Sequence, residues 1–153
     1  MTGRQYTVYT DGASRGNPGQ AGVAFIITDD SVNHSTGWYR YLGRATNNQA
    51  EYTALASALQ HLQSRQSGML KLYSDSELMV RQVNGFYRVK NPQLLELFNQ
   101  VKKLLAGFPQ WTLTHIPRLA NGGADALANR AIDERNTKLR SIAVPEKEEL
   151  PEG

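Results

Sequence analysis

Four acidic residues of this 153-residue chain occupy positions where carboxylates could bind a metal ion. Asp11 and Asp75 each follow a run of β-branched and aromatic residues typical of a strand, where an isolated aspartate is usually a turn former or a helix cap. Glu51 is different, because on a helix it would share an angular position with Leu55 and Leu62. A charged side chain in line with a buried apolar stripe must be paired, protonated or bound to a metal.

Asp125 repeats the pattern of Glu51, because it is aligned with Ala128 and Ile132 on a helix predicted over 121–134. Carboxylates that lie together repel one another and have raised pKa values unless a cation neutralises them. Ligand sets made only of oxygen favour Mg²⁺ or Mn²⁺ over zinc. We therefore expect the four acids to form one metal-binding cluster.

Hydrophobic periodicity and turn signals predict the elements that position these acids. Between the first two strands, the glycine-rich stretch 11–22 is expected to be a loop. The order βββαβααβα indicates one α/β domain, in which ligand sites lie beyond the carboxyl ends of strands. The predicted strands are 6–10, 22–28, 38–42, 70–74 and 111–116; the predicted helices run from 47 or 48 to about 65, and over 76–83, 92–105 and 121–134.

The charge of the chain is unevenly distributed along it. The net charge is +3, but residues 145–153 carry four glutamates and one lysine, a net of −3, which leaves +6 for the remainder. A basic body suggests a polyanionic partner, and nucleic acid is the first candidate, although a modest positive charge also keeps a protein soluble. Residues 141–153 form an acidic segment without periodicity, which we expect to be a disordered tail.

Several protein classes are excluded by what the chain lacks. There is no cysteine, so there can be no disulfide framework and no cysteine-based metal site. No apolar run approaches the roughly 18 residues that a membrane span needs, and the first residues do not resemble a signal peptide. We expect a soluble, cytoplasmic protein with no membrane partner and, since no oligomerisation signal is visible, a monomer.

Four motifs together resemble those of type 1 ribonuclease H, in the order found in that family. Each motif supplies one of the four carboxylates, and they extend over residues 6 to about 134, so that residues 1–140 would be the ribonuclease H catalytic domain. The resemblance implies a ribonuclease H-like α/β fold with a five-stranded mixed sheet flanked by helices, in which the first and fourth strands are parallel neighbours. The motifs are Tyr9-Thr-Asp-Gly-Ala-Ser-Arg-Gly-Asn-Pro-Gly19, Ala45-Thr-Asn-Asn-Gln-Ala-Glu-Tyr52, Tyr73-Ser-Asp-Ser76 and Asn121-Gly-Gly-Ala-Asp-Ala-Leu-Ala128.

The resemblance also implies a reaction. The protein would be an endonuclease that hydrolyses the RNA strand of RNA–DNA hybrids and leaves 5′-phosphate and 3′-hydroxyl ends. Two Mg²⁺ ions, or Mn²⁺ in their place, would lie between the carboxylates and the scissile phosphate. In this scheme Asp11 bridges the two ions, Glu51 and Asp75 hold the ion on the side of the attacking water, and Asp125 holds the other.

Short polar residues near the motif carboxylates are candidates for binding the hybrid. Selecting RNA requires contacts to the 2′-hydroxyl across the shallow minor groove. The same residues could simply form a turn and a helix cap, but a capped helix N-terminus can also bind a phosphate. The positions that match the family's hybrid contacts are Asn17, Asn47, Asn48 and Glu77, and Thr46 would bind a phosphate of the DNA strand.

The segment between the last predicted strand and the last helix looks shorter than in many members of the family, where it carries a catalytic histidine. Both His115 and Arg118 are candidates for an assisting polar group. Strand alternation with Trp111 and Leu113 places His115 inside the strand and leaves Arg118 as the first polar loop residue. We therefore favour Arg118 for handling substrate or product.

A second departure lies before Trp111, where many relatives carry a basic, tryptophan-rich protrusion that grips the hybrid. This chain has a direct connection there without tryptophan, as in the shorter members of the family. Arg88 and Lys90 are its candidate phosphate contacts, although charges on loops are by default only solvated.

Two other functions fit the same fold, namely a non-catalytic nucleic-acid binding domain and another nuclease of the superfamily, such as a junction resolvase. The presence of all four carboxylates disfavours the first, because a buried acidic cluster would repel phosphates. Asn17 and the Thr46-Asn47-Asn48 segment favour the hybrid-specific branch over the second.

Overall fold

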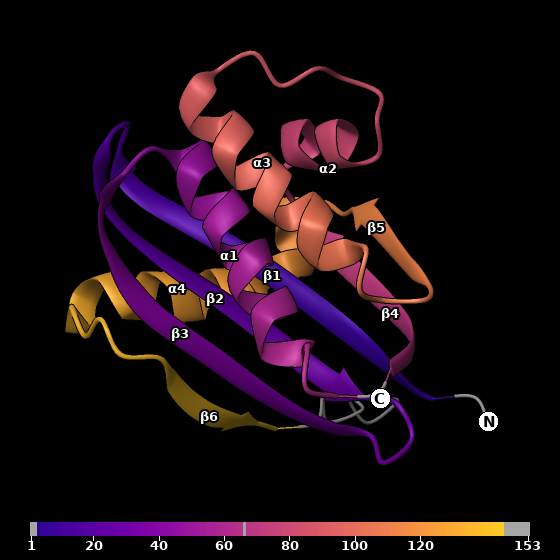
Figure 1. The fold of residues 1–153 in the computed structure, drawn as a ribbon. Helices are drawn as coiled ribbons and strands as arrows, with labels where there is room; N and C mark the ends of the chain where they lie inside the picture. The colour runs from indigo at the N-terminus through magenta and orange to yellow at the C-terminus, as the bar shows by residue number, and fades with distance from the viewer. Residues whose placement is uncertain (1–2, 66, 146–153) are drawn as a thin grey trace.

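Helices cover both faces of a mixed β-sheet in the computed structural model of the protein, which describes residues 3–65 and 67–145 (Figure 1). Helices α1, α2 and α3 pack on one face and α4 on the other. In chain order the elements are β1 (Arg4–Gly16), β2 (Gly19–Asp29), β3 (His34–Ala45), α1 (Asn47–Leu62), β4 (Ser67–Ser74), α2 (Glu77–Val83), α3 (Pro92–Leu105), β5 (Trp111–His115), the 3₁₀ turn η1 (Arg118–Asn121), α4 (Gly122–Glu134) and β6 (Arg140–Val144).

The described strands form a six-stranded sheet in the order β5-β4-β1-β2-β3-β6. The β1–β4 and β4–β5 pairs are parallel and the other neighbouring pairs are antiparallel. In the β1–β4 pair, Thr10 is the register partner of Ser74. The residues that follow them, Asp11 and Asp75, are therefore brought side by side, as the parallel pairing of the first and fourth predicted strands implies.

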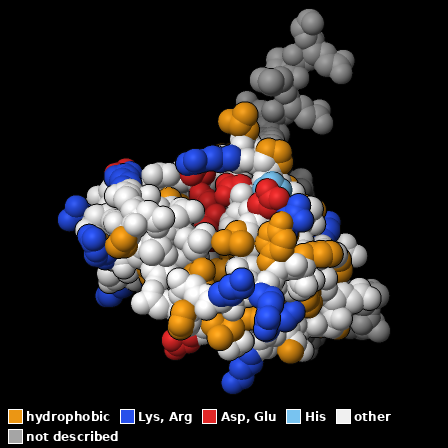
Figure 2. All heavy atoms as spheres, turned by 90° about the horizontal axis from the view of Figure 1, so that it is seen from above, with side chains coloured by type: hydrophobic (Ala, Val, Ile, Leu, Met, Phe, Trp, Pro, Cys, Tyr) orange, Lys and Arg blue, Asp and Glu red, His pale blue; other side chains and the backbone are white. Residues whose placement is uncertain are grey.

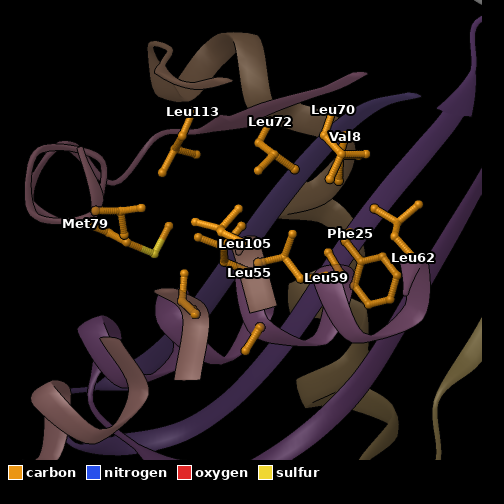
Figure 3. Packing of buried hydrophobic residues seen from close by; sticks show 14 of the residues in the cluster. Val8, Phe25, Leu55, Leu59, Leu62, Leu70, Leu72, Met79, Leu105 and Leu113 are labelled. Carbon is orange, nitrogen blue, oxygen red and sulfur yellow. The ribbon is translucent and has the colours of Figure 1, made fainter. Parts of the chain in front are cut away.

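The main core lies between α1 and the sheet, with α2 and α3 closing its edge (Figure 3). Val8, Phe25 and Leu72 of the sheet are fully buried against Leu55 and other apolar residues of α1. Burial of such side chains contributes about 1.5–3 kcal/mol each. This packing holds α1 firmly on the sheet, and the apolar stripe predicted for that helix is confirmed.

The opposite face is packed by small residues, which let α4 approach the sheet closely. Ala24 of β2 contacts a cluster that contains Ala128 and Ala131 of α4. A Cβ atom on Gly22 would lie only 2.4 Å from the carbonyl oxygen of Ala128, so no larger residue fits there. The close approach brings the first turn of α4 next to β1, so that Asp125 lies beside Asp11.

The glycine-rich stretch expected to be a loop is instead most of a long hairpin, because β1 continues through Gly16 and β2 begins at Gly19. The turn itself uses Gly16, whose φ of 123° favours glycine. Gly12 beneath α1 and Gly22 beneath α4 lie where a helix approaches the backbone, and Gly19 lies against Arg15 within the hairpin. The expectation of a loop was wrong because glycine serves close packing here as well as turns.

The expected five-stranded sheet is also corrected, because β6 adds a sixth strand on the outer edge of β3. Residues 141–144 of this strand belong to the segment 141–153 that was expected to be a disordered tail, of which 146–153 lie outside the described residues. Ile142 and Val144 are half-buried on alternate positions, close to Gly37 of β3. Such a short strand carries too weak a periodic signal to be recognised, and it is stabilised by pairing with an edge that the sequence does not reveal.

Candidate active site

Three of the four predicted acids meet at one end of the sheet. Asp11 lies in β1, Asp75 directly follows β4, and Glu51 reaches across from α1, so that one carboxylate oxygen from each lies within 4.8 Å of the others. Asp11 and Glu51 are 3% and 2% exposed. Figure 2 shows acidic side chains gathered in a hollow of this end of the molecule, with basic and apolar side chains around them.

The position of Glu51 depends on Gly12, the residue after Asp11. The backbone N–H of Gly12 donates a hydrogen bond of 2.6 Å to Glu51 Oε1 in a buried environment. A Cβ atom on Gly12 would lie 2.1 Å from the carbonyl carbon of Ala50, so only glycine lets β1 and α1 come this close. The Asp-Gly pair of the first motif therefore supplies the Asp11 carboxylate itself and, through the Gly12 N–H, holds the Glu51 carboxylate beside it.

Burial and mutual repulsion make the cluster unfavourable as a set of bare charges. Burial, followed by the charge of Asp75, raises the pKa of Asp11 from its ordinary 3.8 to about 8. Burial and the charge of Asp11 raise the pKa of Glu51 well above its ordinary value, although the Gly12 N–H opposes this shift. A site of this kind binds protons when empty and favours divalent cations in their place.

In the absence of divalent ions, we expect Asp11→Asn to stabilise the protein at neutral pH. The pKa of Asp11 is about 8 in the folded protein and about 3.8 in the unfolded chain, so the folded state binds this proton more tightly. The stability that proton binding provides is complete below pH 3.8 and is lost as the pH rises through about 8. The variant should therefore match the wild type near pH 4 and exceed it increasingly up to pH 8. Urea unfolding in a chelator at both pH values measures this difference.

Asp30→Asn is the matched control for that experiment, because Asp30 is ion-paired with Lys71 at the other end of the sheet. The control should not stabilise the protein at either pH. If Asp11→Asn and the wild type had the same free energy of unfolding at pH 8, the charge of Asp11 would not be unfavourable in the folded protein.

Asp75 is held by a buried asparagine that sequence reasoning did not single out. Asn121 donates from Nδ2 to the backbone oxygen of Thr10 at 2.9 Å and to Asp75 Oδ2 at 3.2 Å. It lies at the start of α4 and is 1% exposed, so it joins this helix to β1 and β4. Its place in the fourth motif was the signal that could have identified it.

Asp125, the fourth predicted acid, lies in the first turn of α4, and its side chain is 32% exposed. It is not a member of the group of three, but its hydrogen bond and charge act on Asp11 and help to raise the pKa of that residue. All four acids line one cavity of about 600 Å³. The remaining lining residues include Arg15, Ser76 and Asn129, which sequence reasoning missed.

Arg118 and His115 differ in their relation to this cavity. Arg118 lines it, with Nη2 3.8 Å from Asp125 Oδ1. His115 ends β5 on the same face as Leu113, but it is exposed and does not line the cavity, so the expectation that strand alternation internalises it was wrong. The strand ends at this residue, and alternation predicts burial only where another element covers the face.

The predicted hybrid-binding residues separate into two groups. Thr46 caps α1 by accepting from the Gln49 N–H at 3.1 Å, while the Gln49 side chain accepts from the Thr46 N–H. Asn17 Oδ1 in the hairpin turn accepts from the Asn47 N–H at 3.1 Å, so the turn and the helix start are joined beside the cavity, which Asn47 lines.

Asn48 and Glu77 form the second group and, like Asn17 and Thr46, lie outside the cavity lining. Asn48 is half-buried in the first turn of α1. Glu77 is exposed at the start of α2 and accepts from Arg81 Nε at 2.9 Å.

Among the described helices, none is long and apolar enough to cross a membrane.

Comparisons with known proteins agree with this architecture. Residues 9–131 match a family described as reverse transcriptase-like. Ribonuclease HI of Halobacterium salinarum is 40% identical over 132 residues, covering 86% of this chain and 66% of that protein. A bifunctional protein of Mycobacterium tuberculosis is 36% identical, and the match covers 92% of this chain and 39% of that protein. A ribonuclease H of Dechloromonas aromatica is 31% identical, and the match covers 83% of this chain and 93% of that protein. The chain thus spans less than two-thirds of the first two of these relatives.

Solved structures show the same similarity in three dimensions. The crystal structure of the Halobacterium salinarum RNase H1 has a TM-score of 0.78 at 40% identity and covers 85% of this chain and 98% of that one. LC11-RNase H1, solved in complex with an RNA/DNA hybrid, has a TM-score of 0.77 at 42% identity, covering 84% of this chain and 97% of that one. Since sequence, fold and the arrangement of the motifs agree over most of the chain, it belongs to the type 1 ribonuclease H family.

Proposed function

We propose that the protein is an endonuclease that hydrolyses the RNA strand of RNA–DNA hybrids and leaves 5′-phosphate and 3′-hydroxyl ends. The observation that carries the proposal is the set of three carboxylates, from Asp11, Glu51 and Asp75, whose oxygens lie within 4.8 Å of one another at the cavity floor. A protein that only bound nucleic acid would gain nothing from acids that repel phosphates. A relative that binds an RNA/DNA hybrid, LC11-RNase H1, supports the choice of substrate.

The donor set fits Mg²⁺ or Mn²⁺, because it is made of carboxylate oxygens, and a divalent cation would reverse the raised pKa values of Asp11 and Glu51. Asp11, Glu51 and Asp75 would hold one ion, and Asp125, with Asp11 between the two positions, would hold the second. When bound, the two ions would supply an activated water in line with the phosphorus and charge stabilisation at the leaving 3′-oxygen.

The chain's own residues would orient the hybrid around this centre. The Thr46 hydroxyl accepts from Gln49, which leaves its hydrogen for a phosphate oxygen at the N-terminus of α1. Asn17 uses its Oδ1 on Asn47, and its amide N–H groups, which donate to no described residue, are suited to a 2′-hydroxyl. Asn48 and Glu77 would complete the minor-groove contacts from α1 and α2.

The proposal is tested by incubating the protein with labelled RNA–DNA hybrid, DNA duplex, RNA duplex and single strands, with and without Mg²⁺. Cleavage of the RNA strand of the hybrid only, dependent on Mg²⁺ and yielding 5′-phosphate ends, is the expected result. Cleavage of branched or duplex DNA instead would identify a different nuclease of the superfamily, and binding without cleavage would identify a non-catalytic domain.

Binding should depend only weakly on salt, because the α2–α3 connection offers few free cations. Arg88 and Lys90 are exposed there and form no ion pair with a described residue. The logarithm of affinity falls with log salt in proportion to the phosphates neutralised, and we expect a slope equivalent to about three to five contacts. Arg88→Ala with Lys90→Ala should raise KM and flatten the slope by up to about two units, with turnover at saturating hybrid nearly unchanged.

The control for this prediction is Lys103→Ala with Lys138→Ala, which removes the same charge from two exposed positions outside the cavity lining. It should change the slope less than the first pair does. A steep wild-type slope would reveal a larger basic surface, and an unchanged slope in the first double variant would leave Arg88 and Lys90 as ordinary solvated charges.

A further inference from the structure

Asp125 has a side-chain partner on its own helix, one turn further along. Asn129 donates from Nδ2 to the backbone oxygen of Asp125 at 3.0 Å and contacts its Oδ1 at 3.5 Å. Asn129 is half-buried and lines the same cavity as the four acids. A donor amide beside a carboxylate restricts the rotation of that carboxylate, as the outer partners of metal ligands do.

Asn129 is in turn contacted by an arginine that also lines the cavity. Arg15 of the β1–β2 hairpin places Nη2 3.3 Å from the Asn129 backbone oxygen and 3.4 Å from its Oδ1. The other terminal nitrogen, Nη1, donates to Asp133 Oδ1 at 2.7 Å, one turn beyond Asn129. The Arg15 side chain therefore joins the hairpin to two successive turns of α4 by hydrogen bonds.

These contacts determine which way the Asn129 amide faces. An asparagine amide can flip, because its oxygen and nitrogen occupy nearly equivalent positions, and its neighbours decide the orientation. Arg15 offers only donors, so it requires the oxygen of the amide on its side and leaves the nitrogen facing Asp125. The hydrogen bond from Nδ2 to the Asp125 backbone oxygen favours the same orientation, so without Arg15 the amide would keep that bond and lose the donor to its oxygen.

We propose that Arg15 is a positioning residue for the cleavage reaction, acting on Asp125 through the side-chain amide of Asn129. The inference rests on the proposed function for its consequence, the rate of cleavage, but the geometry it describes is independent of that function. It gives the hairpin a role in holding α4 and its carboxylate at the cavity.

Two other roles for Arg15 make different predictions. As a structural anchor, the Arg15–Asp133 pair would contribute little, because the two side chains are 48% and 64% exposed and surface ion pairs add little stability. As a phosphate-binding residue, Arg15 would act through its charge, and lysine would largely replace it. Only the positioning role requires the second terminal nitrogen, which lysine lacks.

The test compares kcat and KM for Arg15→Ala, Arg15→Lys, Asn129→Ala and the Arg15→Ala/Asn129→Ala double variant. Arg4→Ala is the matched control, because it removes another exposed ion pair of β1, to Asp29 at 2.7 Å, far from the cavity. Asn129→Ala should lower kcat by about tenfold or more, as loss of an outer partner of a metal ligand does. Both Arg15 variants should also lower kcat while KM stays unchanged. The kcat of the double variant should be no lower than that of Asn129→Ala, because both residues act through the same amide.

A second readout does not depend on cleavage. In ¹⁵N-labelled protein without metal or substrate, the side-chain amide resonances of Asn129 should move towards those of an exposed asparagine in Arg15→Ala and Arg15→Lys, and stay in place in Arg4→Ala. Unchanged resonances together with unchanged kcat would overturn the proposal. The proposal would also be overturned if Arg15→Ala raised KM and Arg15→Lys returned KM to the wild-type value, because Arg15 would then bind a phosphate through its charge. If the wild type does not cut the hybrid, the proposed function fails, and the resonances still decide whether Arg15 orients Asn129.

Discussion

Asp11→Asn, Glu51→Gln and Asp75→Asn should each remove nearly all cleavage of the hybrid while the protein stays folded. Partners of metal ligands already contribute about 10–100-fold, so loss of a ligand itself should lower turnover below about 1% of wild type. Each substitution removes one oxygen donor from a group whose members lie within 4.8 Å, and under the proposed mechanism it would remove the activated water and the charge stabilisation together. Single-turnover cleavage at saturating Mg²⁺ measures the effect.

Two controls separate lost chemistry from lost structure in this experiment. Circular dichroism and urea unfolding without metal should show each variant at least as stable as the wild type, because one of several repelling carboxylates is gone. Asp30→Asn removes an acid at the opposite end of the sheet and should keep full activity. Any of the three site variants that retained wild-type turnover would exclude its residue from the site.

The second large effect is expected at Arg118. Its guanidinium lines the cavity and lies 3.8 Å from Asp125, so Arg118→Ala should lower turnover by about an order of magnitude or more, in the range that a positioned charged group contributes. His115 is exposed at the end of β5, and His115→Ala should change stability by no more than about 0.5 kcal/mol. Turnover of both variants at one pH and one metal concentration ranks the two residues.

The dependence of turnover on pH provides an independent check. A histidine that took part would make turnover depend on its protonation, whereas an arginine would not. The pH profile of His115→Ala should therefore match that of the wild type, and Arg118→Lys should recover part of the activity. A larger loss in His115→Ala than in Arg118→Ala would show that His115 is the assisting group, in the place of the catalytic histidine that many members of the family carry in this segment.

The four carboxylates could be singled out from the sequence because their signals are local. Glu51 and Asp125 interrupt apolar stripes on helices, and Asp11 and Asp75 end β-rich runs that prove to be parallel neighbours. The periodicity of a helix or strand is set by its own backbone geometry, so such signals survive without knowledge of the fold. Their order along the chain then identified the family.

The extent of the sheet could not be predicted in the same way. β6 is short and mostly exposed, and only its pairing with the edge of β3 makes it a strand. The stretch 11–22 reads as a loop because glycine is frequent in turns, but Gly12 and Gly22 are required where helices approach the hairpin. In both cases the decisive partner lies far away in the sequence.

By itself, the sequence determined the family, and it predicted the four acids and the chemistry that their oxygen ligands would support, since residue type and local spacing carry this information. Only the tertiary structure decided that Asp11, Glu51 and Asp75 form the close group, that Arg118 rather than His115 lines the cavity, and that Arg15 reaches Asn129. The physical reason is that these contacts join residues up to 114 positions apart, as in the Arg15–Asn129 pair. Their geometry is set by how closely the packed helices approach the sheet, which no local pattern contains.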